Sequence, residues 1–351
     1  MAENAPADTR QTTLDTAALN AWIGDQLPGA GEPLTAERMG ADTGIANALF
    51  IVSRGGSKWV LRQPPLVKNH PSASNTEREW KILKALDGTD VPHPEALLFC
   101  SDTNVLGQPF MIMGLIDGFT PGFSLPEPFL SDKKLRHGLG MAYVDGCASL
   151  ANIADWKERG LGDLGKPEGF LERQVSRWLG QLDGYRTREI PELDFLTKWL
   201  ENNRPEMSRA GILHGDYSPF NVMVANDPPA RLAAVVDWDT GTIGDPLLDI
   251  GHLLARWAEP GEVPLINPQA GGLDGYPRRR EMAAHYAQRT GRDMSAIAYY
   301  EVLALFKLAV ILEGSYARQH AAGVPDAQNA MCQVVIDLMK GAAEFARGER
   351  V

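Results

Sequence analysis

Two polar stretches carry the residue types that phosphoryl transfer requires. Residues 212–224 read ILHGDYSPFNVMV, in which Asp216 and Asn221 stand on a turn between two apolar flanks. Residues 233–246 read AAVVDWDTGTIGDP, in which Asp237 follows an apolar run. Asp216 could accept the proton of a hydroxyl group or align that hydroxyl for attack. Asn221 and Asp237 offer the oxygen ligands that a hard divalent cation prefers.

Turn formation is the simpler explanation for Asp216 and Asn221 taken alone, because Asp and Asn favour turns. The second stretch favours a functional role over turn formation. Asp237 lies sixteen residues after Asn221 and is itself followed by Gly244, Asp245 and Pro246. The two stretches together therefore indicate a site for metal-dependent phosphoryl transfer.

Composition limits the class of protein that could hold such a site. The chain has 351 residues, 44% hydrophobic and 23% charged, which suits one large two-lobed domain or two ordinary ones. A net charge of -11 argues against a nucleic-acid partner and means that a bound nucleotide would need a local cation. The three cysteines show no metal-ligand spacing, and we find neither a signal core nor a membrane-spanning run. We expect a cytoplasmic protein with no membrane partner, whose oligomeric state the sequence leaves open.

The hydrophobic pattern changes from sheet to helix along the chain. We expect an α+β, two-lobed, protein-kinase-like fold, in which an antiparallel-sheet lobe with one internal helix precedes a mainly helical lobe. The expected parts are a disordered tail at 1–12, a nucleotide-binding lobe at 13–113, a hinge at 114–118, and a catalytic and substrate-binding lobe at 119–351. The helices expected in the last lobe cover 131–155, 167–186, 190–203, 277–291, 296–321 and 326–347.

The sequence resembles the aminoglycoside phosphotransferase/choline kinase family from about residue 30 to residue 330. The family's catalytic loop reads H-G-D-x-x-x-x-N, and its metal strand reads I-D-W-E/D followed by G-D-P-x-x-D. Residues 160–182 are similar to the phosphotransferase domains associated with acyl-CoA dehydrogenases. The matching residues are His214, Gly215, Asp216 and Asn221 in the loop, and Val236, Asp237, Trp238, Asp239, Gly244, Asp245, Pro246 and Asp249 in and after the strand.

The resemblance implies ATP and Mg²⁺ as cofactors, with Asn221 and Asp237 as the metal ligands. Arg62 stands where the family has a Lys that holds the α- and β-phosphates. Arg is a good phosphate ligand but is not equivalent to Lys. Glu79, rather than Glu77, matches the helix Glu that pairs with this cation.

Further contacts to the nucleotide are implied by the resemblance alone. Gly44 and Asn47 fall in the phosphate-covering loop, although Ala46 replaces a common Ser and the usual Gly-Gly-x-Ser-Asn pattern is absent. The main chain of the hinge is expected to hold adenine through the Gly114 carbonyl and the Ile116 amide.

Other polar residues of the matched motifs are expected to act structurally. His214 would tie the catalytic loop to a neighbour, and Asp249 would accept backbone amides of that loop. Asp239 has three open explanations: an outer partner of the metal site, a substrate contact, or a solvated charge. Arg173, Arg177 and Trp178 are equally well explained as substrate contacts and as plain helix faces.

We interpret the chain as an ATP- and Mg²⁺-dependent small-molecule kinase that phosphorylates a hydroxyl group. The candidate acceptors are a hydroxyacyl-CoA-like or other hydroxylated metabolite and an aminoglycoside. A catalytically inactive nucleotide-binding regulator is the alternative, which the presence of Asp216, Asn221 and Asp237 together disfavours. A protein-substrate kinase is less well supported, since the chain lacks D-F-G and A-P-E segments.

Overall fold

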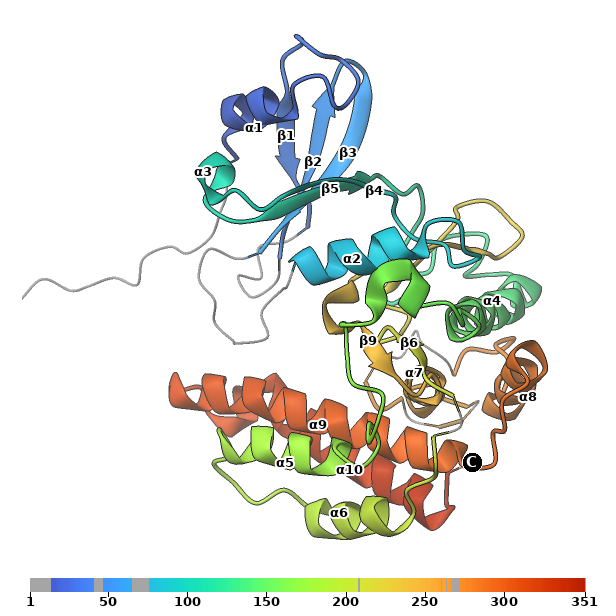
Figure 1. Ribbon diagram of the computed structural model, residues 1–351. Helices are drawn as coiled ribbons and strands as arrows, with labels where there is room; N and C mark the ends of the chain where they lie inside the picture. Colours follow the sequence, from blue (N-terminus) through green and yellow to red (C-terminus); the bar gives the residue numbers. More distant parts are fainter. Residues whose placement is uncertain are drawn as a thin grey trace, which may run out of the picture. The chain divides into compact units, whose positions relative to one another are not determined.

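A five-stranded antiparallel sheet forms the centre of the first of two structural units (Figure 1). The computed structural model describes residues 14–40, 47–64, 76–207, 209–259, 261–262, 264–266 and 272–350. The sheet unit comprises Met1–Thr89, His93–Asp117 and Val236–Gly241, and the helical unit comprises Asp90–Pro92, Gly118–Val235 and Thr242–Val351. The expected tail at 1–12 lies outside the described residues.

Alternating burial and a glycine turn explain the central hairpin of the sheet unit. The strand Ala48–Arg54 alternates buried and half-buried side chains, as expected of a strand with one face on a core. Gly55 and Gly56 both have positive φ, at 57° and 79°, which suits a tight hairpin turn. The strands in sheet order are β1 (Thr35–Arg38), β2 (Ala48–Arg54), β3 (Ser57–Gln63), β5 (Phe110–Gly114) and β4 (Ala96–Cys100).

Among the described residues of the sheet unit, three α-helices and a 3₁₀ turn at Trp238–Thr240 accompany this sheet. α1 (Thr16–Ile23) begins after Asp15, whose carboxylate accepts the Ala18 amide at 2.9 Å, and α2 (Thr76–Leu86) contacts β4 and β5. The short helix α3 (Thr103–Leu106) was not expected, because four residues are too few to show a helical period. The prediction of a single helix inside the sheet was therefore incomplete.

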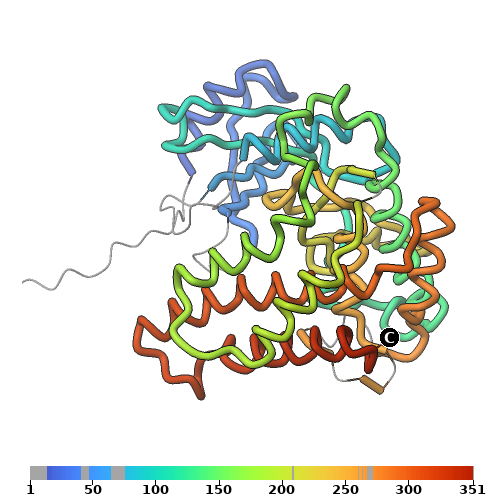
Figure 2. Tube along the Cα trace, turned by 60° about the horizontal axis from the view of Figure 1, so that its bottom comes forward, coloured from blue at the N-terminus to red at the C-terminus, as the bar shows by residue number. Residues whose placement is uncertain are grey.

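The helical unit is built around α9 (Ile297–Ala321), which lies beside α10 (Ala330–Arg347) in both views (Figures 1 and 2). The other helices are α4 (Lys133–Ala151), α5 (Gln174–Asp183), α6 (Leu193–Asn202), α7 (Leu247–Ala255) and α8 (Arg279–Thr290). A π-helix at Lys157–Leu161 and a 3₁₀ turn at Asp326–Gln328 complete them. No helix among the described residues is long and apolar enough to cross a membrane.

Two short antiparallel pairs of strands in the helical unit hold the motif loops. β6 (Gly211–Leu213) pairs with β9 (Thr242–Gly244), and β7 (Val222–Val224) pairs with β8 (Leu232–Val235). The H-G-D-x-x-x-x-N loop therefore runs from β6 to β7. The antiparallel sheet and the helical C-terminal part confirm the predicted α+β fold class.

Helix α7 was also not expected from the sequence. All nine of its residues, LLDIGHLLA, are buried, so the segment lacks the solvent-exposed polar face by which a surface helix is recognised. The predicted helix at 167–186 is also too long, since the helix begins at Gln174, after a turn that contains Pro167 and Gly169.

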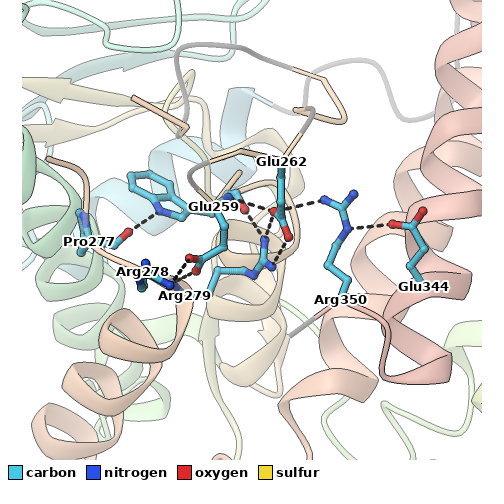
Figure 3. Close-up of polar contacts among 8 residues, drawn as sticks. Glu259, Glu262, Pro277, Arg278, Arg279, Glu344 and Arg350 are labelled. Carbon is cyan, nitrogen blue, oxygen red and sulfur yellow. Dashed lines mark hydrogen bonds and ion pairs between the residues drawn. The ribbon is translucent and has the colours of Figure 1, made fainter. Parts of the chain in front are cut away.

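An ion-pair network joins the residues after α7 to α8 and to the C-terminal end of the chain (Figure 3). Arg279 pairs with both carboxylate oxygens of Glu262, at 2.6 and 2.7 Å, and donates to the Trp257 carbonyl at 2.7 Å. Arg350 reaches Glu262 at 3.5 Å and Glu344 of α10 at 2.9 Å. Glu262 thus links segments that lie far apart in the sequence.

Glu301 on α9 is a buried carboxyl group, 6% exposed, for which the charge of Arg279 compensates only in part. Burial raises the pKa of Glu301 to about 7 from its ordinary 4.5. Between these two values the folded protein keeps a proton that the unfolded chain has lost. The free energy of unfolding is therefore expected to fall as the pH rises through this window, and to stay lower above it.

Glu301→Gln should remove this dependence, because Gln has a similar shape and does not ionise. We expect the variant to match the wild type near pH 5 and to exceed it at pH 8.5 by up to ~3 kcal/mol in denaturant unfolding. Glu201→Gln, at an exposed position of α6, is the matched control and should change neither value. Equal pH slopes for the wild type and Glu301→Gln would contradict the prediction.

Candidate active site

The loop that carries Asp216 is held by its backbone. Gly215 has φ of 83°, a conformation that glycine adopts without strain. The Asp249 carboxylate accepts the His214 amide at 2.6 Å and the Gly215 amide at 2.8 Å, and Lys307 of α9 donates to the Gly215 carbonyl. Asp249 therefore makes the contacts that a brace of this loop requires.

The Asp216 carboxylate is held at both oxygens. Asn221 Nδ2 donates to Oδ2 at 2.9 Å, while His252 Nε2 lies 3.0 Å from Oδ1. Arg256 Nη1 is 3.6 Å from the same Oδ1. The side chain remains 43% exposed, so the carboxylate is fixed in place and still accessible.

Electrostatics keep Asp216 ionised. Burial by itself would raise the pKa of this carboxyl group. The hydrogen bond from His252 and the nearby positive charges, Arg256 and Lys307 among them, outweigh that effect and hold the pKa of Asp216 well below its usual range. A proton acceptor that is always ionised suits a reaction in which the proton leaves late.

Asn221 meets the requirements of a neutral metal ligand. Its Nδ2 donates both to the Asp216 backbone carbonyl and to Asp216 Oδ2, at 2.9 Å each. These bonds do not use the amide oxygen, which is the atom that a hard cation would bind. His214 is fully buried, and its Nδ1 accepts the Asp216 amide at 3.3 Å, which agrees with a structural role.

Three carboxylates converge on Arg62 within the sheet unit. Arg62 Nε lies 2.5 Å from Glu79 Oε2, and Nη2 lies 2.9 Å from Asp237 Oδ1 and 2.8 Å from Asp239 Oδ1. Burial would lower the pKa of Arg62, but these carboxylates raise it, so the guanidinium stays charged. Burial raises the pKa of Glu79 to about 7 despite the charge of Arg62, since the two aspartates share the same cation.

Asp237 stands in the connection from β8 to β9 and combines an exposed carboxylate with an unusual backbone. Its side chain is 48% exposed. Its φ and ψ are both 64°, in the left-handed region that only a few per cent of non-glycine residues occupy. Strained residues of this kind cluster at functional sites. A half-exposed carboxylate is a suitable Mg²⁺ ligand, although no group of three His, Cys, Asp or Glu side chains in the described part of the chain forms a metal cluster.

Asp239 and Asn47 extend the Arg62 cluster within the sheet unit. Asn47 Nδ2 donates to Asp239 Oδ2 at 3.0 Å, and Asp239 is 24% exposed. Asp239 is therefore not a solvated charge, one of the three explanations left open by the sequence. Gly44, expected in the same loop, lies outside the described residues.

The hinge residues differ in their main-chain bonding. The Gly114 amide donates to the Glu95 carbonyl at 2.9 Å. Among the described residues, no hydrogen bond engages the Ile116 amide, which therefore remains a candidate for contact with adenine.

Three residues around Asp216 escaped the sequence analysis: His252, Arg256 and Lys307. A signal for two of them was present, because Asp249, His252 and Arg256 follow one another at spacings of three and four, which places them on one face of a helix. Lys307 gave no such signal, since its acceptor lies 92 residues away in the sequence.

Comparison with known proteins identifies the family and the fold of the chain. Residues 40–282 match the model of a family described as "Phosphotransferase enzyme family". The chain is 31% identical over 316 residues to acyl-CoA dehydrogenase family member 11 of Rattus norvegicus, a match that covers 88% of this chain and 40% of the relative. The chain thus spans less than half the length of that relative.

Solved structures show the same fold. A candidate aminoglycoside phosphotransferase from Ralstonia eutropha has a TM-score of 0.79 at 29% identity, over 96% of this chain and 99% of that one. A thermostable aminoglycoside phosphotransferase mutant in ternary complex with ADP and hygromycin B has a TM-score of 0.58 at 13% identity, over 90% and 95%. The second likeness shows the fold alone.

Proposed function

The chain belongs to the phosphotransferase enzyme family, and we propose that it is a small-molecule kinase that transfers the γ-phosphate of ATP, with Mg²⁺, to a hydroxyl group of a small molecule. One observation carries the proposal. The carboxylate of Asp216 is kept ionised and accessible, with Asn221 on one oxygen and His252 near the other.

Each residue of the proposed mechanism has a distinct task. Asp216 aligns the acceptor hydroxyl and takes its proton late in the transfer. Arg62 binds the α- and β-phosphates, Glu79 orients Arg62, and the Ile116 amide contacts adenine. Asn221 and Asp237 would hold Mg²⁺, which neutralises charge on the transferred phosphoryl group.

The acceptor is proposed to carry an acidic group. A pocket of about 460 Å³ in the helical unit is lined by the basic residues Lys166, Arg173 and Arg177, and no acidic side chain of the described residues lines it. Lys307 Nζ lies 5.6 Å from the ring centre of Trp178, which follows Arg177 on α5. Because Lys307 bonds the loop of Asp216, the basic pocket and this loop are neighbours. A polycationic aminoglycoside would be repelled here, whereas a hydroxyacyl-CoA-like acceptor would be attracted.

A screen of acceptors tests the proposal. Purified full chain with ATP and Mg²⁺ is mixed with hydroxyacyl-CoA thioesters, free hydroxy acids and aminoglycosides, and ADP release and phosphorylated product are measured. We expect transfer to acid-bearing acceptors. Transfer to aminoglycosides alone would overturn the acceptor class. ATP binding without transfer to any acceptor would favour the alternative, an inactive nucleotide-binding regulator.

Arg62→Ala is expected to raise the apparent KM for ATP, and Arg62→Lys to retain part of the activity. Arg62 uses two different nitrogens to reach three carboxylates, which a single Lys ammonium cannot reproduce. The KM for ATP and the Kd for nucleotide are the measurements. An unchanged nucleotide affinity in Arg62→Ala would place Arg62 outside the phosphate site.

This test needs a control for folding. Arg62→Ala leaves the carboxyl group of Glu79, which is 2% exposed, without its cation, and removal of one partner of a buried ion pair destabilises a protein by up to ~3–5 kcal/mol. The double variant Arg62→Ala/Glu79→Gln replaces this carboxyl group by a neutral amide. If the double variant is folded and still has a raised KM for ATP, the rise reflects lost contact with the phosphates and not a loss of folding.

A further inference from the structure

One face of α7 serves two parts of the Asp216 loop. Asp249 accepts two backbone amides at the start of the loop, and three residues later His252 reaches the carboxylate of Asp216. His252 is 3% exposed and so has little freedom to turn away. A short buried helix thus governs both the backbone and the functional side chain of the loop.

The position of the proton on His252 can be argued from its neighbours. His252 Nε2 lies 3.0 Å from Asp216 Oδ1 and 2.9 Å from Arg256 Nη1. A neutral ring nitrogen can donate or accept, but not both. If Nε2 accepted from Arg256, its lone pair would face the anionic oxygen of Asp216 at 3.0 Å. If Nε2 carries the proton, it satisfies Asp216, and Arg256 Nη1 then faces a second donor at 2.9 Å but keeps the charge of Asp216 at 3.6 Å.

The charge state of His252 follows from the groups that face it. Asp216 comes from the loop, Arg256 from the end of α7 and Lys307 from α9. Burial and the two cations outweigh Asp216 and lower the pKa of His252 to about 4. At neutral pH the ring is therefore uncharged, with one proton to place.

We propose that His252 is a positioning residue that donates its Nε2–H to Asp216 Oδ1 and thereby orients the proton acceptor towards the substrate hydroxyl. The inference rests on the proposed role of Asp216. Asn221 holds the other oxygen at 2.9 Å, so the two donors fix the torsion of the carboxylate. Each carboxylate oxygen still has a lone pair free, which is what the acceptor hydroxyl needs.

Arg256 is held by contacts other than a hydrogen bond to His252 in this arrangement. With the Nε2 lone pair unavailable, its guanidinium is held by the charge of Asp216 at 3.6 Å and by the face of Phe220, whose ring centre is 5.8 Å away.

The tautomer can be observed without any acceptor. The full chain, labelled with ¹⁵N in its histidines, is studied by two-dimensional NMR at pH 6–8, and His252→Gln identifies the signal by its loss. We expect a neutral ring protonated at Nε2. A ring protonated at Nδ1, or an imidazolium at pH 7, would overturn the proposal.

Turnover tests the positioning role, with ATP hydrolysis as the probe and water as the acceptor. His252→Phe fills the ring volume without a donor, and His252→Asn folds more readily but has an amide too short to reach Asp216. We expect both to lower kcat by about 10- to 100-fold with an unchanged KM for ATP, since small misplacements of a reacting group have effects of this size. His252→Gln places an amide N–H near the position of Nε2 and should restore most of the rate.

The outcomes separate this inference from the proposed function. If Asp216→Asn hydrolyses ATP normally, the proposed function of Asp216 fails. If Asp216→Asn is inactive while folded His252→Asn turns over like the wild type, only the positioning role fails. A purely structural His252 would lower stability without the split between kcat and KM, and His252→Gln would give no selective recovery of kcat.

Discussion

Asp216→Asn is expected to lower turnover by about 10²- to 10⁴-fold and to leave ATP·Mg²⁺ binding unchanged. The amide keeps the shape of the carboxylate but has no basic oxygen to take the proton of the acceptor. In the proposed scheme Asp216 contacts the acceptor and not the nucleotide. The pKa of Asp216, held well below its usual range, agrees with a loose transition state in which the proton leaves late.

The structure indicates that Asp216→Asn also disturbs the orientation of the side chain at position 216. Both partners of the carboxylate, Asn221 Nδ2 and, in our inference, His252 Nε2–H, are donors. An Asn at position 216 can satisfy only one of them, so part of the loss comes from orientation. Calorimetric titration with ATP·Mg²⁺ and a thermal unfolding curve are the controls. Wild-type turnover would refute the role, and lost ATP·Mg²⁺ binding in a folded variant would move Asp216 into the metal site.

The loop residues could be predicted because their chemistry is local in the sequence. Asp216 and Asn221 lie five positions apart on one turn between β6 and β7, and Asp237 follows the short strand β8. Apolar strands next to polar turns leave a clear pattern even in a single sequence. The predicted pairing of Arg62 with Glu79 also appears in the structure, at 2.5 Å.

The surroundings of these residues were less predictable, for two physical reasons. Helix α7 is buried on all sides, so its sequence carries only Asp249 and His252 as polar residues and lacks the broad polar face of a surface helix. His252 and Arg256 were missed with it. The second reason is distance along the chain: Arg62 reaches Asp237 across 175 residues, and no local pattern encodes such a contact. The left-handed backbone of Asp237 was equally hidden, since Asp adopts that conformation only where tertiary structure imposes it.

That backbone conformation decides how the metal site should be tested. Asp237→Ala is expected to abolish phosphoryl transfer, but Ala at φ of 64° adds backbone strain to the loss of the ligand. Asn tolerates the left-handed region and keeps the shape of Asp, so Asp237→Asn isolates the charge. Charge neutralisation by a metal contributes several kcal/mol to the transition state. We therefore expect turnover to fall by roughly 10³-fold or more in Asp237→Asn, with a higher Mg²⁺ requirement.

Two matched variants make this expectation specific. Asn221→Ala should weaken metal binding less, because a neutral ligand contributes less charge. Asp239→Asn removes another carboxylate that pairs with Arg62, at 2.8 Å, but not a proposed metal ligand, so its Mg²⁺ requirement should stay near that of the wild type. Arg62 keeps Glu79 and one aspartate in either Asp variant, so the fold should survive both. Near-normal turnover in Asp237→Asn, or an equal rise in Mg²⁺ requirement for Asp239→Asn, would show that Asp237 is not the ligand on which transfer depends.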